Sequence, residues 1–218
     1  VPVGQSLMRR GVAPSHALVF LLASPAINPV VLVATAVAFN GNPMMVWARF
    51  AASLAAACVV GWIWMRVRFT IDGIVDDDAC GHHHHRSWEA FRVTAVQDFL
   101  QACGFLVIGA AIAALIKVAV PESALGVVTS NVWLGVAMMV LLAVVMSLCS
   151  EADAFVAASF VGVSPIAQLA FMVVGPMVDI KLIFMQAGAF GWRFVLCFVP
   201  LVLVAAVLSA VGVGIALL

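Results

Sequence analysis

The sequence predicts an all-α integral membrane protein, a polytopic helical bundle with two homologous repeats. Composition, the lengths of the apolar stretches and an internal repeat lead to this fold class. Of the 218 residues, 66% are hydrophobic and 9% are charged, and the mean hydropathy is +1.22. Globular domains carry about 25% charged residues, so this chain is far too apolar to be one. Ten basic and ten acidic side chains cancel, so no net field indicates a nucleic-acid partner.

Several stretches are apolar enough for a membrane helix, which needs about 20 residues to cross the hydrocarbon core. Four of them are uninterrupted: 46–64, 91–120, 127–148 and 194–218. Two more, 11–39 and 162–190, are interrupted by Pro25 and Pro176, which leaves pieces of about 13 residues that span only about 20 Å each. We expect each interrupted region to be a Pro-broken helix or a re-entrant hairpin.

The two interrupted regions are copies of one another. They align without a gap at an offset of 151 residues, and nine of the 29 aligned positions are identical, including one glycine, two prolines and two phenylalanines. One kinked span in each half would make the repeats parallel, whereas a hairpin in each would make them inverted, and both kinds occur in transporters. The charges favour the first arrangement and the short pieces favour the second, so the relative orientation stays open.

A polar segment divides the chain into a first repeat (1–65), a His/Asp-rich loop (66–90) and a second repeat (91–218). The loop contains Arg66, Arg68 and Arg86, and positive charge favours the cytoplasmic side. We therefore expect a multi-pass protein of the inner membrane with this loop inside. The chain starts at Val1 without a signal-like segment, and we expect that an N-terminal part of the first repeat is missing.

The paired interruptions are the first candidate site. Proline is well tolerated at the first position of a helix, so Ser24-Pro25 and Gly175-Pro176 predict the starts of new helices, with Ser24 as an N-cap. A helix N-terminus inside a membrane offers unpaired N–H groups to an anionic or strongly polar ligand. The alternative is a pair of proline kinks that only improve helix packing.

The segment "CSEADAF" is the second candidate, with Cys149, Ser150, Glu151 and Asp153 after a long apolar run. A carboxylate embedded in a membrane is costly and is therefore a functional candidate. Beside the soft sulfur of Cys149, these carboxylates could bind a cation or relay a proton. The alternative is a polar helix cap in the interfacial region.

Asp179 and Lys181 follow the second interruption and are the third candidate. Asp179 aligns with Asn28, and we expect it one turn inside its half-helix, where a carboxylate complements the helix dipole. The sharper hypothesis is that Asn28 and Asp179 face each other across a shared substrate site.

The polar loop is a candidate capture site for a zinc-like ion, because imidazoles and a thiol are zinc ligands. The candidate ligands are Cys80, His82, His83, His84 and His85. The alternative is a solvated linker, and we expect no other cofactor. The motifs HExxH, GxSxG, GxGxxG and the Walker loop are all absent from the sequence, so we do not expect an enzyme.

Three segments resemble the predicted permeases of the YraQ and ArsP type: "VPVGQSLMRRGVAPSHALVFLLASPAINPVVL", "SLCSEADAFVAASF" and "FMVVGPMVDIKLIFMQAGAFGWRFVL". The similarity covers nearly the whole chain. It implies a polytopic inner-membrane protein and, by its best understood members, efflux of trivalent organoarsenicals. In that family a cysteine-containing motif precedes the "VPV" segment. This chain begins after that motif, which leaves Cys149 as the one cysteine beside a candidate site.

We therefore expect a secondary permease that exports a small substrate, such as a trivalent organoarsenical or a soft metal ion, between the paired broken helices. Its partners would be the substrate and the lipid bilayer, with a homo-oligomer left open. The alternative is a non-transporting scaffold or metal-handling subunit that uses the His-rich loop. The residues do not determine the substrate, the coupling ion or the direction of transport.

Overall fold

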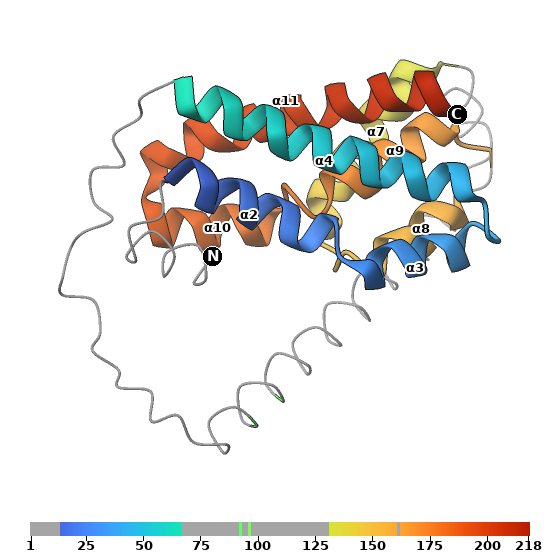
Figure 1. Ribbon diagram of the computed structural model, residues 1–218, viewed down its shortest axis with the longest axis horizontal. Helices are drawn as coiled ribbons and strands as arrows, with labels where there is room; N and C mark the ends of the chain where they lie inside the picture. Colours follow the sequence, from blue (N-terminus) through green and yellow to red (C-terminus); the bar gives the residue numbers. More distant parts are fainter. Residues whose placement is uncertain (1–13, 67–91, 93–95, 97–130, 161) are drawn as a thin grey trace.

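A computed structural model describes residues 14–66, 92, 96, 131–160 and 162–218. Within these ranges every regular element is an α-helix, as expected for an all-α membrane protein. The helices form an elongated bundle, with α4 and α11 side by side along its length (Figure 1). The predicted 91–120 span, apart from residues 92 and 96, and the predicted 66–90 loop, apart from Arg66, lie outside the described residues.

The first interrupted region is one broken span. It consists of α2 (Pro14–Ala26) and α3 (Pro29–Ala38), which follow one another in the same general direction (Figure 1). Together they give a membrane-span candidate from His16 to Ala38, and α4 (Pro43–Arg66) gives a second of 24 residues. Of the two forms that the proline pattern left open, this region therefore has the kinked span rather than the hairpin.

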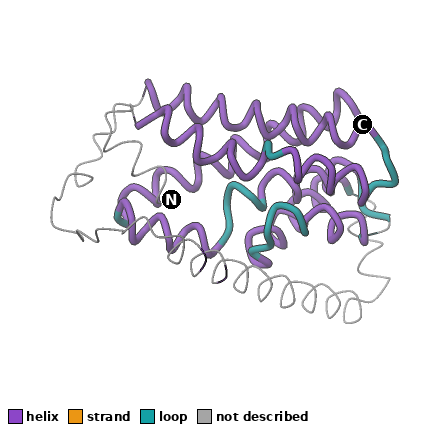
Figure 2. The backbone as a smooth tube through the Cα atoms, turned by 60° about the horizontal axis from the view of Figure 1, so that its bottom comes forward, coloured by secondary structure: helices purple, strands orange, loops and turns teal. Residues whose placement is uncertain are grey.

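The second part of the chain contains five helices: α7 (Val132–Met146), α8 (Asp153–Ser159), α9 (Pro165–Val174), α10 (Ile180–Phe190) and α11 (Trp192–Leu217). α9 and α10 make the second broken span, and α11 is a membrane-span candidate of 26 residues. Non-helical segments therefore lie inside the bundle as well as at its ends (Figure 2).

The prediction of a full crossing over 127–148 is wrong for the part that is described. α7 has only 15 residues, about 22 Å at 1.5 Å per residue, and it ends where Ser147 adopts a left-handed conformation (φ 47°). α8 then returns toward the end of the bundle from which α7 came (Figure 1). α7 and α8 thus form a re-entrant hairpin, because the turn at 147–152 reverses the chain at mid-bundle.

The two broken spans run in opposite directions. α2 is antiparallel to α4, since Val19 packs on Gly61, and α4 is antiparallel to α11, since the ring centroids of Trp64 and Phe194 are 5.4 Å apart. The start of α9 packs on the end of α11, so α9 is antiparallel to α11 as well. It follows that α2 and α9 are antiparallel, as expected if the repeat is inverted.

Helix boundaries keep the register of the sequence alignment. α3 begins at Pro29 and α10 at Ile180, and α4 ends at Arg66 and α11 at Leu217, so the offset of 151 residues recurs in α4 and α11. α4 packs against α11, and α4 carries a set of fully buried small or branched side chains: Ala48, Ala52, Ala56, Ala57 and Val60. Small side chains allow the close helix approach on which packing within membranes depends.

Candidate functional site

The first interruption comes from a proline other than the one predicted. Pro25 lies inside α2, and the helix stops at Ala26 because Asn28 precedes Pro29. A residue before proline avoids the α conformation, and Asn28 is extended (φ −69°, ψ 135°). Its side-chain oxygen accepts a hydrogen bond of 3.0 Å from the N–H of Val30. The predictions of a helix start at Pro25 and an N-cap at Ser24 are therefore wrong: α3 starts at Pro29 and Asn28 caps it.

At the second interruption, too, an extended polar residue caps the helix that follows. α9 ends at Val174, Pro176 lies in the following turn, and Asp179 is extended (φ −138°, ψ 166°). The Asp179 carboxylate accepts a hydrogen bond of 2.5 Å from the N–H of Leu182 and caps α10. The predicted helix start at Pro176 is wrong, and Asp179 lies before the helix rather than one turn inside it. Asn28 and Asp179, which align in the sequence, thus perform the same capping role.

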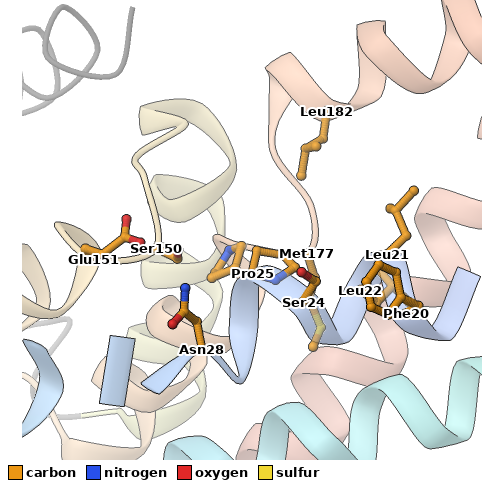
Figure 3. Close-up of a pocket in the computed structure, with 11 residues that line it drawn as sticks. Phe20, Leu21, Leu22, Ser24, Pro25, Asn28, Ser150, Glu151, Met177 and Leu182 are labelled. Atoms are coloured by element: carbon orange, nitrogen blue, oxygen red, sulfur yellow. The ribbon is translucent and has the colours of Figure 1, made fainter. Parts of the chain in front are cut away.

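A cavity of about 460 Å³ lies between the two interruptions. Its walls come from the second half of α2, the 147–152 turn, the turn after α9 and the first turn of α10 (Figure 3). The lining side chains are Phe20, Leu21, Leu22, Ser24, Pro25, Asn28, Ser150, Glu151, Pro176, Met177 and Leu182. Six of the ten predicted substrate residues are in this set: Ser24, Pro25, Asn28, Ser150, Glu151 and Pro176.

The other four predicted substrate residues do not line this cavity. Cys149 is half-buried in the turn next to Ser150, and Asp153 is buried at the start of α8. Asp179 is buried at its cap position, whereas Lys181 is exposed. Asn28 therefore borders the cavity without Asp179 opposite it, because the Asp179 carboxylate is held by the backbone of α10.

The cavity is polar at one end and apolar at the other. Glu151 and Asn28 lie together at one end, and Phe20, Leu21 and Leu182 lie toward the other (Figure 3). Pro25 has no N–H, so the carbonyl of Leu21 lacks its normal intrahelical donor beside the cavity. One carboxylate, one amide, two hydroxyls and the thioether of Met177 thus border an otherwise apolar space, which is typical of a small-molecule site.

A fully buried ion pair lies behind the cavity wall. The Nη2 of Arg49 lies 2.8 and 2.9 Å from the two carboxylate oxygens of Asp153 and donates to the carbonyl of Ser150 at 3.0 Å. Its Nη1 donates to Thr35 Oγ1 at 2.7 Å, and Thr35 in turn donates to the carbonyl of Val31. The exposed fractions of Arg49 and Asp153 are 0% and 1%. One guanidinium thereby joins α3 and α4 to the 147–152 turn and to α8.

Sequence reasoning missed Arg49 and Thr35. A signal was present for Arg49, because a single arginine within an apolar span is itself a functional candidate. Its partner Asp153 is 104 residues away, and no local pattern could have joined them. Thr35 carried no signal, since a threonine in an apolar helix usually bonds its own backbone.

The candidate metal ligands of the loop, Cys80 and His82 to His85, lie outside the described residues. Among the residues that are described, no group of three or more His, Cys, Asp or Glu side chains is placed to hold a metal ion.

Comparison with known proteins places the chain in a family. A family model described as predicted permease matches residues 1–215. A Streptococcus mutans protein named "Putative two-component membrane permease complex subunit" is 33% identical over 211 residues, covering 91% of this chain and 68% of that protein. The UPF0718 protein YcgR of Bacillus subtilis is 35% identical over 212 residues, covering 94% and 71%. No solved structure matches the chain. The apolar broken spans, the central cavity and these matches agree, and the chain belongs to this family of predicted membrane permeases.

Proposed function

We propose that this membrane permease exports a small substrate through the cavity between its two interruptions. One observation carries the proposal: Pro25 and Pro176, 151 residues apart in antiparallel spans, border a single cavity. Irregular backbone at membrane depth is tolerated where it lines a cavity or is covered by protein. Broken helices whose ends meet at a central site are a common architecture of secondary transporters.

Alternating access is the mechanism that the geometry supports. The lining extends from the interruptions along α2 and the start of α10, toward the end of the bundle that holds Arg66 and Arg193. No lining residue comes from α8, α9 or α3 beyond its cap. Among the described residues, the lining is therefore confined to one half of the bundle, and antiparallel repeats would allow the other half to open in turn. Protons or the membrane potential would drive the cycle, because the sequence has no Walker motif.

We infer that the substrate is a trivalent organoarsenical or a soft metal ion. The thioether of Met177 is a soft ligand in the lining, Glu151 supplies a carboxylate, and the half-buried thiol of Cys149 adjoins the lining residue Ser150. The resemblance to permeases of the ArsP type supports the same class.

Flux measurements test this function. Vesicles containing the purified protein should move phenylarsine oxide several-fold faster than protein-free vesicles. Glu151→Gln should lower this rate at least tenfold, because it removes the carboxylate that borders the cavity. The matched control, Arg66→Gln, removes a charge at the end of α4 and should leave the rate unchanged. Folded protein without flux of organoarsenicals, Cu⁺ or Zn²⁺ would contradict the proposal.

A second candidate is supported by the name of the Streptococcus mutans relative, which describes a subunit of a complex. Under this alternative the chain is a scaffold or metal-handling subunit that uses its His-rich loop. Deletion of residues 76–86 distinguishes the two. Retained flux supports the permease, whereas loss of a cellular metal response from a chain that shows no flux of its own supports the subunit.

A further inference from the structure

The Arg49–Asp153 ion pair lies between the cavity and the far half of the bundle and joins residues 104 positions apart. We propose that Arg49 and Asp153 form a gate, which closes the transport pathway at the end of the bundle opposite Arg66 and Arg193. This inference rests on the proposed transport function and adds two residues to its mechanism.

The pair lies directly behind the cavity wall. Ser150, whose side chain lines the cavity, accepts a hydrogen bond from Arg49 through its carbonyl. A Cβ added to Gly175, next to the lining residue Pro176, would lie 3.8 Å from Asp153 Oδ2. Only the turn and the end of α9 therefore separate the ion pair from the cavity.

Among the described residues, the region beyond the pair is closely packed. Toward the far end of the bundle, α3 and α8 contribute the buried side chains Val31, Ala154 and Ala157, and the buried Phe160 follows α8. On the near side of the interruptions the cavity extends along α2 and α10 instead. Among the described residues, the cavity thus extends along one half of the bundle, and the Arg49 cluster lies between it and the packed other half.

The pair also joins the two repeats. Arg49 and Thr35 belong to the first, whereas Asp153, Ser150 and Met172, whose sulfur lies 3.9 Å from Arg49 Nη1, belong to the second. Movement of one repeat against the other must therefore stretch or break these contacts.

Within the described part of the chain, some polar atoms of the cluster have no hydrogen-bond partner, which is consistent with contacts that break and form again during a cycle. Arg49 Nε and Ser53 Oγ, one turn apart on α4, are buried and have no hydrogen-bond partner among the described residues. A purely structural network is expected to be fully bonded, since an unpaired buried polar group is costly. Water entering an open pathway would hydrate these groups together with the separated charges, whereas separated apolar side chains would gain nothing from water. Glu151, on the same turn, lines the cavity and is a further charged group that acts on Asp153.

An apolar replacement of both residues separates a gate from a structural pair. The double variant Arg49→Met with Asp153→Leu keeps similar volumes and removes both charges, so the protein should fold. If the pair is a gate, the flux of phenylarsine oxide should fall at least tenfold, while the Kd for this compound stays within twofold. If the flux stays at the wild-type rate, the pair is structural and the proposal fails. Wild-type protein without any flux would instead refute the proposed function.

Cysteine accessibility tests the gate without a substrate. In a chain whose five native cysteines are replaced by alanine, Ala157→Cys places a thiol in the packed region beyond the pair. A membrane-impermeant thiosulfonate reagent, added from that side, should react at least tenfold faster when Asp153→Asn weakens the pair, and slowest in the apolar double variant. Leu218→Cys, exposed at the same end, is the control and should react equally in all three backgrounds. Equal rates at position 157 would overturn the proposal.

Discussion

At the scale of single residues, the caps of the two broken helices are the most regular feature. Asn28 and Asp179 both leave the helical conformation and both bind a backbone N–H of the following helix. Asn and Asp are about equally good N-caps, and replacement by Ala costs about 1 kcal/mol. We expect Asp179→Asn to leave the unfolding temperature in detergent nearly unchanged and Asp179→Ala to lower it. If both variants lower it equally, the charge of Asp179 has a role beyond capping.

Replacement of the buried Arg49 is expected to change the stability of the protein more than replacement of a cap does. Arg49→Ala leaves the Asp153 carboxylate buried and unpaired, and breaking a buried pair in this way costs about 3–5 kcal/mol. Arg66→Ala, which removes an arginine at the end of α4 that lies over the Trp62 ring, should cost far less. Thermal unfolding of the two purified variants provides the comparison. Equal stability of the two would mean that the pair contributes little to folding.

Residue chemistry was predictable where local sequence determines it. The candidate lining residues Ser24, Asn28 and Glu151 stood out because they are polar in apolar surroundings, and all three border the cavity. The capping roles were harder to predict, because Pro25 and Pro29 are both compatible with a helix start and the sequence does not show which of them is used. The partner of Asp153 could not be found, because the contact spans 104 residues.

At the scale of elements, proline was a good guide to interruptions and a poor guide to their exact positions. Pro25 is the last residue but one of α2, so it removes a single hydrogen bond and the helix continues past it. The break comes only where the next proline restricts Asn28. Apolar composition likewise predicted a crossing over 127–148, but it does not distinguish a spanning helix from α7, which the left-handed Ser147 ends.

The close packing of α2 on α4 predicts how glycine substitutions change the stability of the protein. A Cβ on Gly61 would collide with Val19, so Gly61→Ala should destabilise the protein by about 1–3 kcal/mol. Gly212→Ala in α11 meets no atom within 4 Å and should be neutral or slightly stabilising, because alanine favours helices. Unfolding temperatures of both variants should show this order. Adding Val19→Ala to Gly61→Ala should restore stability, and failure to do so would place the clash elsewhere.

At the scale of the whole molecule, two arginines predict the orientation in the membrane. Arg66 ends α4 and Arg193 begins α11, so both lie at one end of the bundle, which we expect to be cytoplasmic. In intact cells, a membrane-impermeant thiol reagent should label Asn42→Cys, in the loop at the opposite end, and not Arg193→Cys. The reverse labelling pattern would invert the orientation and the direction assigned to the gate.

The orientation of the repeats could not be derived from the sequence. Counting crossings requires each apolar stretch to cross, and the α7–α8 hairpin breaks that assumption because it returns to its own side. Because the α7–α8 hairpin does not cross the membrane, the number of crossings between the two copies is one fewer than the sequence suggested. Kinked spans are then compatible with antiparallel repeats. The similarity of the two copies was visible in the residues, but their direction depended on tertiary contacts.

The register of 151 residues also shows where the two halves differ. It aligns Thr35 with Gln186 and Arg49 with Pro200, which lies inside α11. A twofold-symmetric permease would spend equal time facing each side when at rest. Here the contact at one end is an arginine bound to a carboxylate, and the equivalent place at the other end has a helix-bending proline and an amide. If the proposed alternating access operates, we expect the two orientations to be unequally populated at rest, because the residues that hold the two ends closed differ.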